Sequence, residues 1–268
     1  MGRLTRSWFL VAAPGVVAVA LALAGPLMVD DDATASRGRP FLPPAPGLPL
    51  GTDHLGRDVW SMVLDSGLTL IVLPLVATTI GTVIGASLGL LTGWRRTALG
   101  VVAVRASELL LVVPPLLITV LALNAASGSG TAVLIVVVAL LGVPSTMRFT
   151  RAATSAVVNR GYVEHAVAMG ERTPTLLVRE VLPTVTAPIL ADAGLRLVGA
   201  IYVIASVSFL GLGGSALGDS WAGMVADNVV GVPLNPWAVI VPAAAIVAVV
   251  ISINLVADRV ADTARRSM

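Results

Sequence analysis

Six apolar runs, each near the length needed to cross a lipid bilayer, constrain the fold of this 268-residue chain more than any other feature. They cover residues 8–29, 68–91, 101–123, 131–147, 187–210 and 236–257. About 20 apolar residues in a helix span the roughly 30 Å of bilayer hydrocarbon, and a helix satisfies its own backbone there. Only 12% of residues are charged, against about a quarter in soluble domains. We therefore predict an all-α integral membrane protein with six transmembrane helices.

Arginine sets the orientation of these runs. With the N-terminus inside, only Arg37, Arg39 and Arg57 lie outside. Basic residues accumulate in cytoplasmic loops, so both termini are predicted to be cytoplasmic. The same distribution explains a sequence pI near 9.9 at a net charge of only +2, and it argues against nucleic-acid binding. The arginines on the cytoplasmic side are Arg3, Arg6, Arg95, Arg96, Arg148, Arg151, Arg160, Arg172, Arg179, Arg259, Arg265 and Arg266.

The first apolar run has two interpretations. Arg3 and Arg6 precede an apolar stretch that ends in Ala22-Leu23-Ala24, which is typical of a secretory signal cleaved before Gly25. The run is longer than the apolar core of a usual signal, which favours an uncleaved anchor helix.

The segment between the first two runs is predicted to be an external loop. Residues 30–56 are rich in proline, which favours extended polyproline II structure over helix. Turn residues at Gly51 to Asp53 precede a predicted short amphipathic helix, with Asp58 in its first turn. Asp53, His54 and Asp58 also suggest a metal site. Three ligands in one flexible turn are a weak pattern, so we expect turn formation and capping, and no metal.

Glycine recurs every fourth residue in the second run, at Gly81, Gly85, Gly89 and Gly93. This spacing stacks the glycines on one helix face, and small residues let two helix backbones approach closely in lipid. We predict a helix-packing face. Its partner is either another helix of this chain or a helix of a second subunit.

Prolines and charge pairs lie inside the third and fifth runs. Pro114-Pro115 predicts a kink at mid-depth. Arg105 and Glu108 are three residues apart, and Asp192 and Arg196 are four apart, spacings at which opposite charges meet on a helix. Each pair either satisfies itself near the headgroups or lines a solute path. The two prolines and the second pair are therefore candidate path-lining residues.

A polar segment, residues 148–186, separates the fourth and fifth runs. Connections are usually much shorter, which indicates a function for this one. Tyr162 to Met169 is predicted to form a short helix, and Gly170 a break after it. Thr173-Pro174 is expected to start a second helix, because Pro is tolerated in a first turn. With Pro183 closing the segment, the result is a compact lobe on the cytoplasmic side.

Missing residue types exclude several activities. The chain contains neither Cys nor Lys, so it lacks a thiol nucleophile and the lysine of a Walker A phosphate loop. If ATP drives its work, another chain hydrolyses that ATP. His54 and His165 lie on opposite sides of the membrane, and neither His-Glu-x-x-His nor Gly-x-Ser-x-Gly occurs. We therefore do not expect an enzyme.

Several motifs together resemble one family. Glu164 to Pro183, EHAVAMG and then EVLP, resembles the EAA loop of permeases of ATP-binding-cassette (ABC) importers. GTDHLGRDVWS, the glycine series, RASELLLVVPPLLI, SFLGLG and DSWAGM also follow the order of that family. Together they resemble the second, C-type permease subunit of dipeptide, oligopeptide and nickel importers over nearly the whole chain. His165 and Glu180 depart from the pattern, which usually has Ala and His there.

The resemblance implies a type I ABC importer permease fold in a bacterial plasma membrane. It implies a homologous permease subunit, two cytoplasmic ABC ATPases that bind the ATP, and an extracytoplasmic solute-binding protein as partners. Trp221 and Met224 lie either in an aromatic belt at the membrane interface or along a cavity. The residues implied to form the ATPase-coupling loop are Tyr162, Glu164, His165, Ala166, Gly170, Leu182 and Pro183.

On this basis the chain divides into three parts. They are an N-terminal anchor with its external loop (1–67), a core permease domain (68–258) that contains the coupling loop 148–186, and a cytoplasmic tail (259–268). The expected function is an ATP-driven importer permease. The rival is a secondary transporter or channel working without ATP, which would show mid-span acids or inverted repeats. The resemblance implies di- or oligopeptides as the cargo, with nickel chelates, glutathione and other small solutes as the alternatives.

Overall fold

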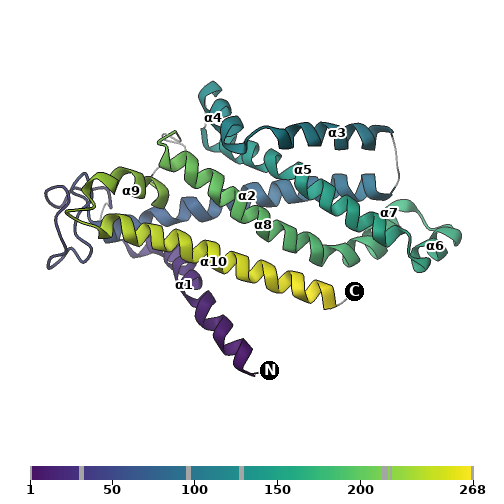
Figure 1. Ribbon diagram of the computed structural model, residues 1–268, viewed down its shortest axis with the longest axis horizontal. Coiled ribbons are helices and arrows are strands. Elements are labelled where there is room, and N and C mark those ends of the chain that lie inside the picture. The colour runs from purple at the N-terminus through teal and green to yellow at the C-terminus, as the bar shows by residue number, and fades with distance from the viewer. Residues whose placement is uncertain are drawn as a thin grey trace.

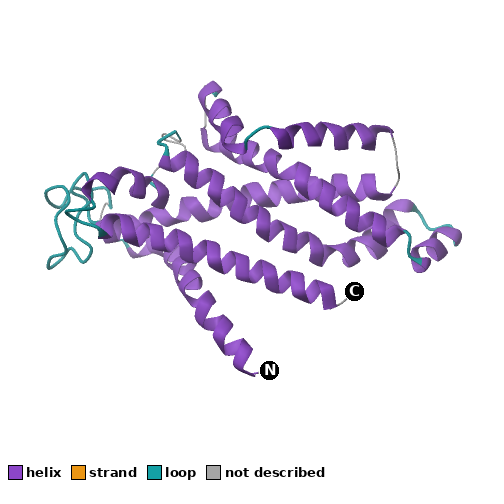
Figure 2. Ribbon diagram, viewed as in Figure 1, coloured by secondary structure: helices purple, strands orange, loops and turns teal. Residues whose placement is uncertain are grey.

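The computed structural model describes residues 2–29, 33–94, 98–126, 130–212, 217 and 219–266. These residues are mostly helical, and Figure 2 shows no strand among them. The elements are α1 (Gly2–Met28), α2 (Val59–Trp94), α3 (Ala98–Val112), α4 (Pro115–Ala125), α5 (Gly130–Val158), α6 (Gly161–Ala168), α7 (Thr173–Leu176), the π-helical turn η1 (Leu177–Val181), α8 (Leu182–Phe209), α9 (Trp221–Asn228), the 3-10 turn η3 (Val229–Gly231) and α10 (Trp237–Arg266).

The helices form an elongated bundle (Figure 1). Helices α2, α5, α8 and α10 run along its length, and α1 packs against α2 and α10. At one end, the loop from residue 33 to 58 lies beside α9 and η3; we call this region the cap. At the other end, residues 159–181 with α6, α7 and η1 project beyond the bundle; we call this region the lobe.

Four helices are long and apolar enough to cross a membrane. They are Val59–Trp94, Gly130–Val158, Thr173–Phe209 and Trp237–Ala261. Ala13–Met28 and Pro115–Ala125 are shorter apolar helices. The protein is therefore an all-α, multi-pass membrane protein. The third predicted run is not one helix, because the expected kink at Pro114 is a complete break between α3 and α4. Pro114 precedes α4 in an extended conformation and Pro115 occupies its first turn.

The glycines that recur every fourth residue on α2 face α5 of the same chain. A Cβ on Gly85 would lie 2.9 Å from the Cβ of Thr146, and one on Gly89 would lie 2.6 Å from the Cβ of Thr150. Gly93 meets Thr154 in the same way at 2.7 Å, and Gly81 lies against the backbone of Ala139. No side chain larger than hydrogen fits at these distances without a shift. The partner helix that the sequence left open is therefore α5.

The separate amphipathic helix expected before the second run does not form. Helix α2 begins at Val59 and continues without interruption to Trp94. Asp58 caps it, because its carboxylate accepts hydrogen bonds from the backbone N–H of Trp60 and Ser61 at 3.2 and 3.3 Å. Val59, Met62 and Val63 are buried in the main core, so tertiary packing extends the helix beyond the bilayer-length run.

The close α2–α5 contact predicts a sharp difference between two glycine-to-alanine variants. Gly89→Ala places a Cβ 2.6 Å from the Cβ of Thr150 and 2.7 Å from the carbonyl oxygen of Met147. We expect this overpacking to lower the free energy of unfolding by about 1–3 kcal/mol. In the control, Gly142→Ala on α5, the new Cβ meets nothing within 4 Å. Thermal unfolding of the purified variants in detergent measures the difference, and equal melting temperatures would contradict the assigned interface.

Candidate functional site

The lobe is built on longer helices than the sequence predicts. Helix α5 extends to Val158, so Arg148 and Arg151 lie in a helix and not in the predicted loop 148–186. Helix α6 follows almost at once, beginning at Gly161. The helix that becomes the next long span starts at Thr173, with Pro174 in its first turn as expected.

Gly170 ends α6 at the predicted break. Its φ of +82° lies in the left-handed region that favours glycine. The N–H of Gly170 donates to the carbonyl oxygen of Val167 at 3.0 Å, and the N–H of Glu171 donates to that of Ala166 at 3.2 Å. These two bonds form a Schellman motif, which satisfies the last carbonyls of the helix and turns the chain sharply.

One side of the lobe is fixed to the helical bundle. Val163 of α6 and Val181 of η1 are almost fully buried. They belong to a cluster, separate from the main core, that also includes Ala86 of α2, Val157 of α5 and Ile189 of α8. The lobe therefore moves with the ends of three long helices and is not a free loop.

The opposite side of the lobe is exposed and partly apolar. Tyr162, Val167 and Met169 are 43%, 51% and 74% exposed. Glu164 and His165 are also exposed, and Ala166 is half-buried. A surface that combines large apolar side chains with a carboxylate and an imidazole is suited to a protein partner.

Leu182 and Pro183 do not close the lobe as predicted. Leu182 begins α8, and Pro183 occupies its first turn within one helical segment from Thr173 to Phe209. Proline lacks the N–H that an α-helix needs, but the preceding turn is π-helical, and Leu182 N–H donates to Leu177 O five residues back. The widened turn lets the helix continue through the proline.

Asp192 and Arg196 meet on α8 as their spacing predicts. The Nε–H of Arg196 donates to one carboxylate oxygen of Asp192 at 3.3 Å, and the hydroxyl of Thr146 on α5 donates to the other at 3.0 Å. Asp192 is buried, whereas the Arg196 side chain is 39% exposed. Both line a cavity of about 390 Å³ with Ser145, Arg148 and Phe149. Glu108 of the predicted Arg105–Glu108 pair lies outside the described side chains.

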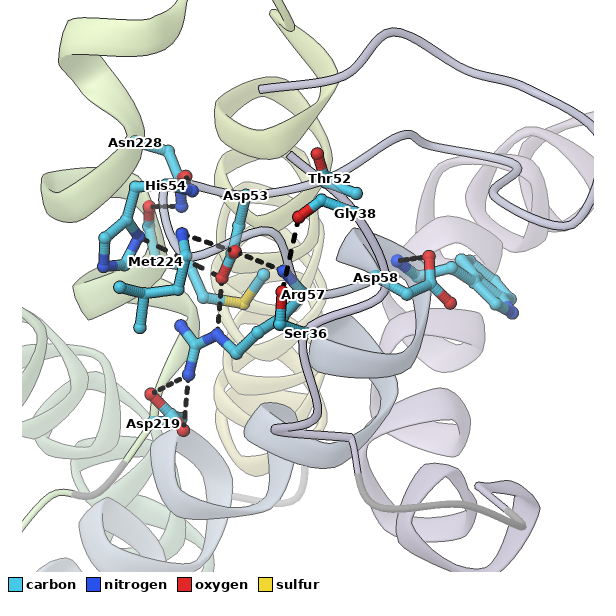
Figure 3. Close-up of polar contacts among 12 residues, drawn as sticks. Ser36, Gly38, Thr52, Asp53, His54, Arg57, Asp58, Asp219, Met224 and Asn228 are labelled. Atoms are coloured by element: carbon cyan, nitrogen blue, oxygen red, sulfur yellow. Dashed lines mark hydrogen bonds and ion pairs between the residues drawn. The ribbon is translucent and has the colours of Figure 1, made fainter. Parts of the chain in front are cut away.

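In the cap, Asp53 organises the turn that precedes α2 (Figure 3). Its carboxylate accepts hydrogen bonds from the backbone N–H of Leu55 and Arg57, and from the Nε–H of Arg57 at 2.6 Å. Arg57 also contacts Asp219 at 3.3 Å. Asn228 accepts from the backbone N–H of His54 at 2.8 Å. Asp53 and Asp58 thus have the turn and capping roles expected, while the distant partners Asp219 and Asn228 carry no local sequence signal.

Trp221 and Met224 lie in the interior of the subunit. Trp221 is only 1% exposed, and its Nε1–H donates to the carbonyl oxygen of Val63 at 2.8 Å. Met224 is also buried in the main core. The burial of both side chains departs from the exposed position expected of an interfacial aromatic belt, and a role along a cavity stays a prediction. Both are buried because α9 folds back against α2 and α8, with Ser220 capping its N-terminus.

A second glycine turn lies where α8 ends. Gly211, two residues after Phe209, has a φ of +67°, and its N–H donates to the carbonyl oxygen of Ser208 at 2.9 Å. Gly213 and Gly214 lie outside the described residues.

Comparison with known proteins agrees with this architecture. Residues 81–268 match the family described as binding-protein-dependent transport system inner membrane component. The glutathione transport system permease protein GsiD of Pectobacterium atrosepticum is 32% identical over 213 residues, which cover 80% of this chain and 70% of that protein. The di/tripeptide transport system permease protein DppC of Pseudomonas aeruginosa is 33% identical over the same shares.

A longer alignment comes from the dipeptide transport system permease protein DppC of Haemophilus influenzae. It is 28% identical over 261 residues, which cover 92% of this chain and 85% of that protein. The resemblance stated from the sequence motifs is confirmed, and the chain belongs to the family of binding-protein-dependent transport system inner membrane components, the permeases of ABC transporters.

Proposed function

We propose that this protein is one of two permease subunits of an ATP-driven importer. It pairs with a homologous permease, two ABC ATPases and an extracytoplasmic solute-binding protein. The observation that carries the proposal is the lobe: one side is anchored in the bundle by Val163 and Val181, and the other exposes Tyr162, Val167 and Met169. A partner that binds the exposed side acts directly on the long helices.

The orientation of the chain follows from its arginines. Arg148, Arg151 and Arg160 lie at the lobe end of the bundle, and Arg172 and Arg179 lie in the lobe itself. The positive-inside tendency assigns this end to the cytoplasm, where the ATPases work. The cap then faces outward and is available to a solute-binding protein.

ATP hydrolysis belongs to the partner ATPases in this proposal. The chain has no Lys for a phosphate-binding loop, so we expect it to bind no nucleotide and to catalyse no reaction itself. Closure of the ATPases displaces the lobe, and α5 and α8 follow as rigid bodies.

Small peptides are the cargo that we propose. The similar proteins are named for transport of glutathione, di- and tripeptides and dipeptides. All of these solutes are short peptides with a free carboxylate, and that shared chemistry is the basis for the proposal.

The Schellman turn at Gly170 provides a test of coupling. Gly170→Val forces a β-branched residue into a left-handed conformation, at a cost of about 1–2 kcal/mol or more, which is enough to shift the population of the lobe conformation roughly 5- to 30-fold. We expect ATP-driven uptake into proteoliposomes to fall several-fold at an unchanged amount of membrane-inserted protein. Gly161→Val is the matched control. Neither position has an atom within 4 Å of the added Cβ, and only Gly170 has positive φ. Equal uptake by the two variants would contradict a coupling role.

Photocrosslinking identifies the partner of the lobe. The chain has no native Cys, so the thiol of Ala168→Cys, at an exposed position, is the one site in this chain that benzophenone maleimide can label. On illumination of the assembled complex, we expect it to capture an ABC ATPase, identified by mass spectrometry. Val163→Cys, at a side chain 1% exposed, is the control and should remain unlabelled. Efficient labelling of Ala168→Cys without capture of an ATPase would show that the lobe is only a connector.

A further inference from the structure

A cavity between α5 and α8 contains more positive than negative charge. Its lining includes two arginines, Arg148 and Arg196, and one carboxylate, Asp192. Asp192 already uses both oxygens, accepting from Thr146 and from the Nε–H of Arg196. These three side chains thus give the cavity a formal charge of +1.

The pairing leaves several hydrogen-bond donors of the two arginines without a partner among the described residues. Asp192 holds Arg196 by Nε alone, and the two terminal nitrogens of that guanidinium bond to none of the described residues. Arg148 likewise has no hydrogen bond or ion pair within the described part of the chain. The hydroxyl of Ser145 lines the same space. Two guanidinium groups and a hydroxyl together suit a ligand with one negative charge and two acceptor oxygens.

The depth of the cavity distinguishes two sources of such a group. Arg148 directly follows the apolar run 131–147, and Thr146 beside it contacts Asp192 of α8. Arg148 lies two residues from Thr146 toward the lobe, and Arg196 lies four residues beyond Asp192 away from the lobe, so Arg196 is about 9 Å deeper at 1.5 Å per residue. The cavity therefore leads from the cytoplasmic boundary into the hydrocarbon layer. A lipid phosphate stays at the boundary, but the carboxylate of a solute crossing the membrane passes Arg196.

Two further cavities share residues with this one. Arg196 also lines a deeper space of about 110 Å³ between α2, α5 and α8, where the hydroxyls of Thr78 and Thr82 have no hydrogen-bond partner among the described residues. Arg148 also lines a space of about 720 Å³ at the lobe end, together with Arg151. Polar groups without partners are expected to be hydrated, and each of the two arginines lines two of these three spaces.

We propose that Arg148 and Arg196 form a carboxylate-binding subsite for the transported peptide on the cytoplasmic half of its route, with Asp192 and Thr146 as positioning residues. The proposal rests on the proposed import function. Arg148 and Arg196 contact the carboxylate as the peptide leaves for the cytoplasm. Asp192 and Thr146 keep the guanidinium of Arg196 oriented without contacting the peptide.

Charged thiol reagents report the electrostatics of the subsite. In the assembled transporter in phosphatidylcholine nanodiscs, Ser145→Cys places a thiol in the cavity. We expect negatively charged sulfonatoethyl methanethiosulfonate to label it about tenfold faster than the positively charged trimethylammonium reagent, relative to their rates with a free thiol. Arg148→Gln or Arg196→Gln should remove most of this preference. Arg151→Gln is the control, because Arg151 lies outside the cavity. The intact mass of this chain gives the rates.

Protection by peptide tests the ligand class. Dialanine should slow labelling of Ser145→Cys, and dialanine amide, which lacks the carboxylate, should not. In Arg196→Gln, protection by dialanine should require a roughly tenfold or greater concentration. Equal protection by both peptides, or by neither, would overturn the proposal. Protection by phosphatidylglycerol nanodiscs without peptide would assign the cavity to a lipid phosphate and overturn it too. ATP-driven uptake by Ser145→Cys, measured in parallel, tests the import function separately.

Discussion

The rest of the structure depends on the close contact between α2 and α5. Gly85, Gly89 and Gly93 recur with the same period as Thr146, Thr150 and Thr154, so each glycine receives one threonine. The hydroxyls of Thr150 and Thr154 have no hydrogen-bond partner among the described residues. The hydroxyl of Ser155 on α5 donates to the carbonyl oxygen of Gly93 at 3.3 Å, and close packing supplies the rest of this contact. Packing is expected to dominate between helices in lipid, because lipid tails are as apolar as the side chains and the hydrophobic effect contributes little there. The same contact connects the two ends of the protein, because α2 begins in the cap and α5 ends at the lobe.

The chain uses buried charge in two different ways. In the cap, Arg57 lies between Asp53 and Asp219, so the cation is enclosed by two carboxylates and fixes the loop on α9. On α8, Asp192 is fully engaged but Arg196 keeps donors open toward a cavity. Arg57 engages two carboxylates, through Nε and one terminal nitrogen, and its position is explained by folding alone. A cation held in place with open donors is suited to a ligand, and this contrast separates the structural cluster from the proposed subsite.

Features with local causes could be predicted from the sequence. Gly170 ends α6 because glycine adopts a positive φ easily. Asp58 caps α2 because its carboxylate reaches the backbone N–H groups of the first turn. Pro114 interrupts the third apolar run because it lacks an N–H. The Asp192–Arg196 contact likewise follows from four-residue spacing.

Features that depend on distant contacts could not be predicted. Trp221 is enclosed because α9 folds onto α2, although its sequence context resembles an interfacial tryptophan. Helix α5 continues past its apolar run because Val157 packs beneath the lobe. Pro183 fails to end the segment because a π-helical turn absorbs the missing hydrogen bond. In each case tertiary packing outweighs the local signal.

The π-helical turn also bears on how motion would pass through the lobe. In the proposed transporter, a displacement of α6 reaches α8 through η1, where Leu177 and Val181 are buried against α2 and α5. A flexible loop at this place would absorb the displacement, whereas a continuous helical segment from Thr173 to Phe209 transmits it. The segment carries Asp192 and Arg196 past Thr146 on α5. Relative movement of α5 and α8 would therefore change the spacing of Arg148 and Arg196, so the ATPase-driven step and the release of a bound carboxylate are expected to be the same event.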